Sequence, residues 1–188
     1  MTVDKIFEAI SAHMVEGLMI HSKLSNYYGF LGLKGYEFCH RYHYYLENKN
    51  YVKLNEYYLY HYGKLIPDSS FVNPNIIPEN WYSHERHDVT NETRKNAIQT
   101  GMITWVKWEQ ETKDLYKNMY LELHQSGHYD AALGIIRDLI RDVDEELADA
   151  KQMWLKKEIM EYDINDIVLE QDDIYKKCKK KIKEIELC

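Results

Sequence analysis

Hydrophobic residues recur every three or four positions over four long stretches of the chain, which is the spacing of one buried face of an α-helix. The pattern predicts helices over about residues 3–30, 36–65, 90–125 and 131–157. Glycine and proline, at 8 and 3 residues, are scarce. All three prolines (Pro67, Pro74 and Pro78) fall in one irregular connection over residues 66–89, so the flanking helices are expected to run without interruption.

A connection as long as residues 66–89 is uncommon in a compact domain. In a four-helix bundle such a link usually crosses over, so helices two and three lie parallel. The link also holds His84 and His87, which we expect to be exposed to solvent. The predicted fold class is therefore all-α, a four-helix bundle over residues 1–157 with a long crossover between helices two and three. Residues 158–188 form a tail with a short C-terminal fifth helix after Asp163.

Polar side chains interrupt the apolar faces of these helices. The face of helix three contains Ile98, Met102, Trp105, Glu109, Thr112, Tyr116, Met119 and Leu123. The face of helix two contains Tyr36, His40, His43, Glu47, Asn50, Leu54, Tyr58 and His61. An unpaired buried carboxylate is costly, so Glu47 and Glu109 are expected to have partners.

Two further helices carry an acid near the apolar face. Glu16 lies beside the face of helix one, Asp142 borders that of helix four, and Glu146 lies at its edge. Converging carboxylates repel one another and require cations, and such oxygen ligands suit Mg²⁺, Mn²⁺ or iron. We therefore expect a metal site inside the bundle, with Asp142 or Glu146 as the acid from helix four.

The amino-acid composition limits the kinds of partner and the cellular compartment that we expect. A net charge of −7 over 188 residues argues against nucleic acid as the main partner, and the lysine run at 176–183 is expected to be a solvated helix end. Cys39, Cys178 and Cys188 are too far apart for a metal-binding spacing or a disulfide framework, which fits a reducing compartment. The sequence has no evident signal peptide and no apolar run long enough for a membrane span, so we expect a cytoplasmic protein.

Three stretches of sequence resemble a known family. "LENKNYVKL", residues 46–54, resembles the Glu-x-x-His segment of its second helix and follows "GYEFCHRYHYY" at the family's interval. "WEQETKDLYKNMYLELHQSGHYDAALGIIRDLIRDVDEEL" resembles its third and fourth helices without a gap. On these segments, residues 5–157 are similar to the ferritins, and most of all to bacterial non-haem ferritins.

The resemblance implies a di-iron centre inside the bundle. The matching ligand positions are Glu16, Glu47, Asn50, Glu109 and Asp142, with Glu145 in the accessory third-iron region. Asn50 replaces the family's histidine, and an amide oxygen is a much poorer iron ligand than imidazole. Lys23 replaces a buried tyrosine of the family and is placed to substitute for metal charge. His43, one turn before Glu47, is either a substitute ligand or an ordinary buried polar residue.

Two functions follow from the resemblance. In the first, the protein is a ferroxidase-type enzyme that oxidises Fe(II) with dioxygen or peroxide and stores or sequesters iron. In the alternative, it is a structural member of the family with a vestigial, metal-free centre neutralised by Lys23; another divalent metal is a further alternative. The family also implies a homo-oligomer such as a shell of 24 subunits, and we predict no haem and no nucleic-acid or membrane partner.

Overall fold

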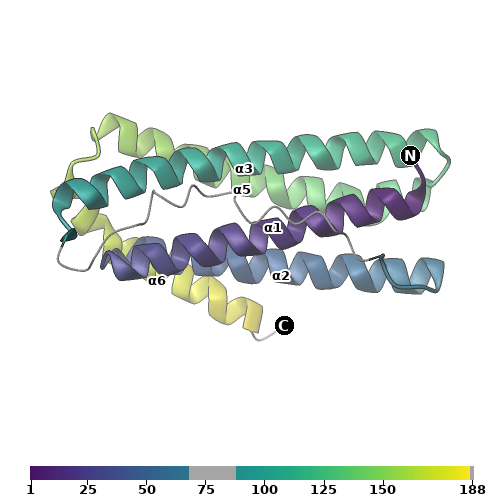
Figure 1. Ribbon diagram of the computed structural model, residues 1–188, viewed down its shortest axis with the longest axis horizontal. Coiled ribbons are helices and arrows are strands. Elements are labelled where there is room, and N and C mark those ends of the chain that lie inside the picture. The colour runs from purple at the N-terminus through teal and green to yellow at the C-terminus, as the bar shows by residue number, and fades with distance from the viewer. Residues whose placement is uncertain (68–87, 187–188) are drawn as a thin grey trace.

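The computed structural model describes residues 1–67 and 88–186, and this part of the chain contains helices and no β-strand (Figure 1). The long helices are α1 (Val3–Phe30), α2 (Lys34–Tyr62), α3 (Asn91–Gln125), α5 (Arg137–Ile159) and α6 (Ile164–Glu186). A short helix, α4 (Tyr129–Ala131), and a π-helical segment, η3 (Ala132–Ile136), lead directly into α5. The all-α prediction and the four predicted bundle helices are confirmed.

Contacts between the helices give their directions. The Tyr58 hydroxyl donates to Asp4 Oδ1 at 2.6 Å, so the end of α2 lies beside the start of α1. The Tyr28 hydroxyl donates to the Ala97 carbonyl at 3.2 Å, so the end of α1 lies beside the start of α3. Both α2 and α3 are therefore antiparallel to α1 and parallel to each other, as the sequence predicts (Figure 1).

The connection expected to carry the chain back lies mostly outside the described residues. Residues 68–87 lie outside the described residues, and they include Pro74, Pro78, His84 and His87. The expected exposure of the two histidines stays a prediction. The connection ends at Thr90, where α3 begins. The Thr90 side chain accepts a hydrogen bond from the Thr93 amide at 3.1 Å, as part of a capping box.

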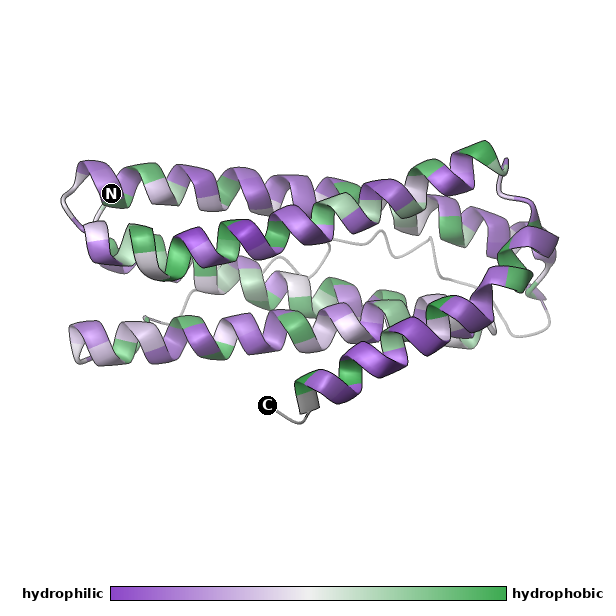
Figure 2. Ribbon diagram, turned by 180° about the vertical axis from the view of Figure 1, so that it is seen from behind, coloured by the Kyte–Doolittle hydropathy of each residue, from purple (hydrophilic) through white to green (hydrophobic). Residues whose placement is uncertain are grey.

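The buried faces follow the predicted period. All eight predicted core positions of α3 are buried, and on α2 only His61 of the eight is exposed. Figure 2 shows hydrophobic and hydrophilic residues mixed within short distances along the helices. In the described residues, no helix combines the length and the apolar character that crossing a membrane requires.

Two parts of the fold differ from the sequence prediction. Leu133, expected in the core, is 46% exposed because η3 changes the phase of the helix at its start. The tail helix α6 has 23 residues, so the expected short helix is wrong in length. It packs along α2, where the Gly35 amide donates to Gln171 Oε1, and an ion pair joins Lys157 of α5 to Glu170.

Candidate metal centre

A layer of buried polar side chains crosses the middle of the bundle. It separates two hydrophobic clusters, one around Leu24 and Ile98 and the other around Ile10 and Leu123. Its buried members are His21, His40, His43, Glu47, Asn50, Glu109, Thr112 and Glu146. Buried charged and polar groups of this kind are rare unless they are paired or bind a ligand.

Helical spacing brings these side chains to one level. His40, His43, Glu47 and Asn50 follow one face of α2, at intervals of three or four residues. Glu109 occupies the corresponding face of α3 and Glu146 that of α5. Helix α1 contributes His21 from the next turn along the bundle.

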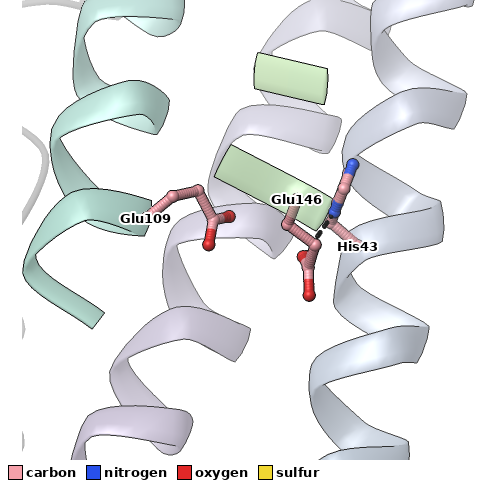
Figure 3. A group of neighbouring side chains, drawn as sticks. All are labelled: His43, Glu109 and Glu146. Carbon is pink, nitrogen blue, oxygen red and sulfur yellow. Dashed lines mark hydrogen bonds and ion pairs between the residues drawn. The ribbon is translucent and has the colours of Figure 1, made fainter. Parts of the chain in front are cut away.

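Three of these residues form a compact group. One ligand atom each of His43, Glu109 and Glu146 lies within 4.8 Å of the other two, and all three side chains are buried. Figure 3 shows that they reach from three different helices toward a common space. Ligand atoms lie about 2.0–2.2 Å from a bound transition-metal ion, so a small inward adjustment would let these three bind one ion.

Hydrogen bonds hold all three of these side chains in place. His43 Nδ1 lies 2.8 Å from Glu146 Oε2. The Trp105 indole N–H donates to Glu109 Oε1 at 2.8 Å, from one turn earlier in α3. These bonds leave the second carboxyl oxygen of Glu109 and of Glu146 for a ligand.

A second group of rings lies against Glu109. His21 Nε2 is 3.8 Å from Glu109 Oε1, and His21 Nδ1 is 3.0 Å from His40 Nδ1. The Nε2 atoms of both histidines are buried and have no hydrogen-bond partner among the described residues. An unsatisfied buried polar atom is costly, so these orphaned atoms fit a centre that receives a further ligand.

Glu47 approaches α1 at a position without a side chain. A Cβ atom on Gly17 would lie 2.9 Å from Glu47 Oε1 and 3.3 Å from Trp108 Cζ2. Gly17 therefore leaves the space that the Glu47 carboxyl and the Trp108 ring occupy. At this level of the bundle, α1 therefore contributes a glycine and no carboxylate.

Burial controls the ionisation of the cluster. It raises the pKa of Glu47 and Glu109 well above the ordinary range, and the Glu146 charge raises both further. Burial, followed by the charge of Asp142, raises the pKa of Glu146 to about 8. Without a cation, the carboxyl groups therefore retain protons at neutral pH, and a divalent ion would replace those protons.

Burial lowers the pKa values of the histidines in the cluster, whereas it raises those of the carboxyl groups. Burial, followed by the charge of Lys181, lowers the pKa of His43 to about 3. Burial also lowers the pKa of His21 and His40; the His43 ring adds to the effect at both, and the His21 ring adds to it at His40. The rings are therefore neutral at pH 7, which is the form that binds metal ions.

The structure brings together some of the predicted ligands. Glu47, Asn50 and Glu109 are buried on facing helices, as expected. Asn50 lies one turn beyond Glu47, on the same face of α2.

The other predicted ligands lie elsewhere. Glu16 is half-buried and lines a surface pocket beside His13, because Gly17 takes the inward position and one residue turns a helix by about 100°. Asp142 is half-buried beside Arg141, 3.5 Å away, and Glu145 is exposed.

The sequence named two of the remaining residues of the cluster as alternatives and missed a third. Glu146, the alternative to Asp142, supplies the buried carboxyl of helix four, and His43, the substitute ligand, lies beside it. His21 is a residue that the sequence reasoning missed, although it lies four positions after Gly17 on the same face of α1. Lys23 is half-buried, and its proposed role as a substitute for metal charge stays a prediction.

A pocket of about 310 Å³ leads toward the cluster. His43 and Trp105 line it from the bundle, and Asp149, Lys177 and Lys181 line it from α5 and α6. The pocket offers a small molecule or ion a route from the surface to His43 without opening the bundle.

Comparisons with protein-family models, curated proteins and solved structures found no match to this chain. The similarity to the ferritins therefore depends on the sequence segments quoted above. What the structure adds is a helical bundle and a buried group of His43, Glu109 and Glu146 that could hold a metal ion.

Proposed function

We propose that the protein binds a divalent transition-metal ion at His43, Glu109 and Glu146, with Glu47 beside them. The observation that carries the proposal is that three ligand atoms from three helices lie within 4.8 Å of one another in the centre of the bundle. One nitrogen with carboxylate oxygens is a donor set that suits iron, manganese and zinc.

We further propose that the ion is Fe(II), and that the protein oxidises it and sequesters the ferric product. Iron supplies the redox chemistry, with dioxygen or peroxide as the oxidant. The ferritin-like segments and the inward carboxylates of the bundle support this choice over other metals.

The chain's own residues would bind and orient the ion. Trp105 fixes one oxygen of Glu109, and the contact with His43 fixes one oxygen of Glu146. The buried carboxyl groups would release protons as they become ligands, and the pocket lined by Asp149 leads outward. The apolar clusters on either side exclude bulk water from the centre.

Metal binding under nitrogen and then oxidation in air test the proposal in two steps. We expect metal-free protein to take up Fe(II) under nitrogen, and the Fe(II) to be oxidised in air faster than in buffer. Glu109→Gln keeps an acceptor for Trp105 but removes the charge, so it should weaken binding by at least about tenfold. The matched control is Glu111→Gln, which makes the same change at an exposed position of α3.

The result of each step decides a different part of the proposal. Equal uptake by the two variants would exclude the cluster as the binding site. Uptake that depends on Glu109 without oxidation above the buffer rate would retain the metal site and overturn the ferroxidase activity. Zn²⁺ and Mn²⁺, tested in parallel, identify the preferred ion.

One observation favours the alternative of a metal-free structural centre. The carboxyl of Glu146 and the ring of His43 lie 2.8 Å apart and are both neutral at pH 7, so protons alone can satisfy this pair. In that case the protein takes up no metal, and Lys23→Tyr with Asn50→His, which restores the family's residues, should create metal uptake. Failure of Fe(II), Zn²⁺ and Mn²⁺ to bind the unmodified chain would support this alternative.

The ferritin resemblance also supports self-association. We propose a homo-oligomer, such as a shell of 24 subunits. Solution mass from light scattering distinguishes a shell from a dimer or a monomer.

A further inference from the structure

Two cysteines face each other where the tail helix crosses the bundle. Cys39 of α2 is 4% exposed and Cys178 of α6 is 5% exposed, and both belong to one hydrophobic cluster. They also line the same pocket, the one that leads to His43.

The packing of α6 on α2 fixes their register. On one side of the pair, the rings of Phe38 and Tyr175 lie 4.6 Å apart, centroid to centroid. On the other side, Lys181 Nζ lies 4.8 Å from the centre of the Tyr42 ring. Because the two helices run in the same direction between these contacts, Cys39 and Cys178 are directly opposed.

The two thiols are chemically different. The interaction between the two thiol groups raises the pKa of Cys39 and lowers that of Cys178. Burial adds to the rise at Cys39, and Lys181 and Lys177 favour the thiolate at Cys178. A thiolate near cations and open to a pocket is the reactive form of cysteine, whereas a buried protonated thiol beside it can resolve an oxidised partner.

We propose that Cys178 and Cys39 form a peroxide-reactive dithiol that closes to a disulfide between α6 and α2. The Cys178 thiolate attacks one oxygen of hydrogen peroxide; the O–O bond breaks, Cys178 becomes a sulfenic acid and hydroxide leaves. The Cys39 sulfur then attacks the Cys178 sulfur, the S–O bond breaks, and the Cys39 proton and the departing hydroxide form water. The hydroxide released in the first step takes up the proton that Cys178 lost on ionisation, so two thiols lose two electrons in total and one peroxide is reduced to two waters.

The disulfide would join α6 to α2 at the wall of the pocket. Its formation requires no metal ion, so the inference does not depend on the proposed metal-binding function.

The experiment uses the full chain with Cys188→Ser, which leaves only the two cysteines of interest. The protein is reduced, freed of metal with a chelator and treated with hydrogen peroxide. We expect both thiols to disappear, the mass to fall by two hydrogens, and a non-reduced digest to contain a Cys39–Cys178 disulfide that dithiothreitol reverses. Thiols that persist under this treatment, or a disulfide that joins two chains, would overturn the inference.

Single variants separate the roles of the two cysteines. With Cys39→Ser, Cys178 should stop at the sulfenic acid, which dimedone traps. With Cys178→Ser, Cys39 should react at least about tenfold more slowly than the pair, because it remains a buried protonated thiol. Equal rates for Cys39 alone and for the pair would show that Cys178 is not the attacking residue.

Discussion

Replacing Glu146 by glutamine should stabilise the metal-free protein while abolishing the proposed metal binding. The substitution keeps nearly the same shape and removes the ionisable group. A glutamine amide can still bond to His43 Nδ1, which lies 2.8 Å from Glu146 Oε2. The change therefore isolates the free energy of ionisation from that of packing.

The magnitude follows from the shift in the pKa of Glu146, from 4.5 to about 8 on folding. At pH 7 the carboxyl is ionised in the unfolded chain and protonated in the folded one. The 2.5 pH units between 4.5 and 7 correspond to an upper limit of about 3–4 kcal/mol of lost stability, at about 1.4 kcal/mol per unit. Burial of the glutamine amide offsets part of this cost, so we expect Glu146→Gln to raise the free energy of unfolding by about 1–3 kcal/mol.

The pH dependence has a defined sign. A raised pKa means that the contribution of Glu146 to stability is fully present below pH 4.5, where both states are protonated. It is lost progressively as the pH rises toward 8, the pKa in the folded state. The advantage of Glu146→Gln should therefore vanish near pH 4 and grow up to about pH 8.

Urea denaturation of chelator-treated protein between pH 4 and 8 measures this difference. The matched control is Glu145→Gln, the same change at the exposed neighbouring position, which should alter stability by less than about 0.5 kcal/mol at every pH. If the two variants gave the same pH profile, the reasoning from burial would be refuted. Metal titration of the same samples should show binding by Glu145→Gln and none by Glu146→Gln.

Further predictions concern the helix packing, the helix caps and the metal. Gly35→Ala should lower the free energy of unfolding by about 1–3 kcal/mol, because the new Cβ would lie 2.6 Å from the backbone oxygen of Gln171; Gly134→Ala, whose Cβ has its nearest neighbour at 3.5 Å, should be neutral or stabilising. Urea denaturation compares the two, and equal losses would contradict the close approach of α6. Thr90→Ala should cost about 1 kcal/mol by thermal or chemical denaturation because it removes the cap of α3, and an unchanged stability would show that the cap contributes nothing. A bound divalent ion at 100 times its dissociation constant should raise the stability by about 2.7 kcal/mol, and a chelator should reverse the gain; a stability that does not respond to any ion tested would contradict the metal site.

The sequence predicts the helices well because the hydrophobic period is a local property. All eight positions of the α3 face are buried, including Glu109, and the α2 face from Tyr36 to Tyr58 is buried as predicted. Both faces have apolar residues on each side of the polar positions, so their rotation is well determined by the sequence. The end of α2 at Gly63, where the backbone is left-handed with φ 67°, also lies within three residues of the predicted boundary.

The rotation of α1 and α5 about their axes is less well determined by the sequence. Glu16 and Gly17 differ by about 100° around α1, and both border its apolar face. Their placement depends on the space that Glu47 and Trp108 need, which belongs to other helices. Asp142 and Glu146 are similarly close neighbours on α5, and the contact of Glu146 with His43 of α2, which belongs to another helix, marks it as the inward acid.

The position of the polar layer itself argues for a function. The hydrophobic clusters on either side show that this chain can fill its core with apolar side chains at most levels of the bundle. At the level of Glu47, Glu109 and Glu146 it instead buries three acids whose pKa values are raised, and leaves the Nε2 atoms of His21 and His40 without partners among the described residues. Well-packed hydrophobic residues at such positions are often as stable or more stable. A cation would be a stabilising ligand for these groups. Removing the acids one at a time should therefore weaken metal binding and raise the free energy of unfolding of the metal-free protein.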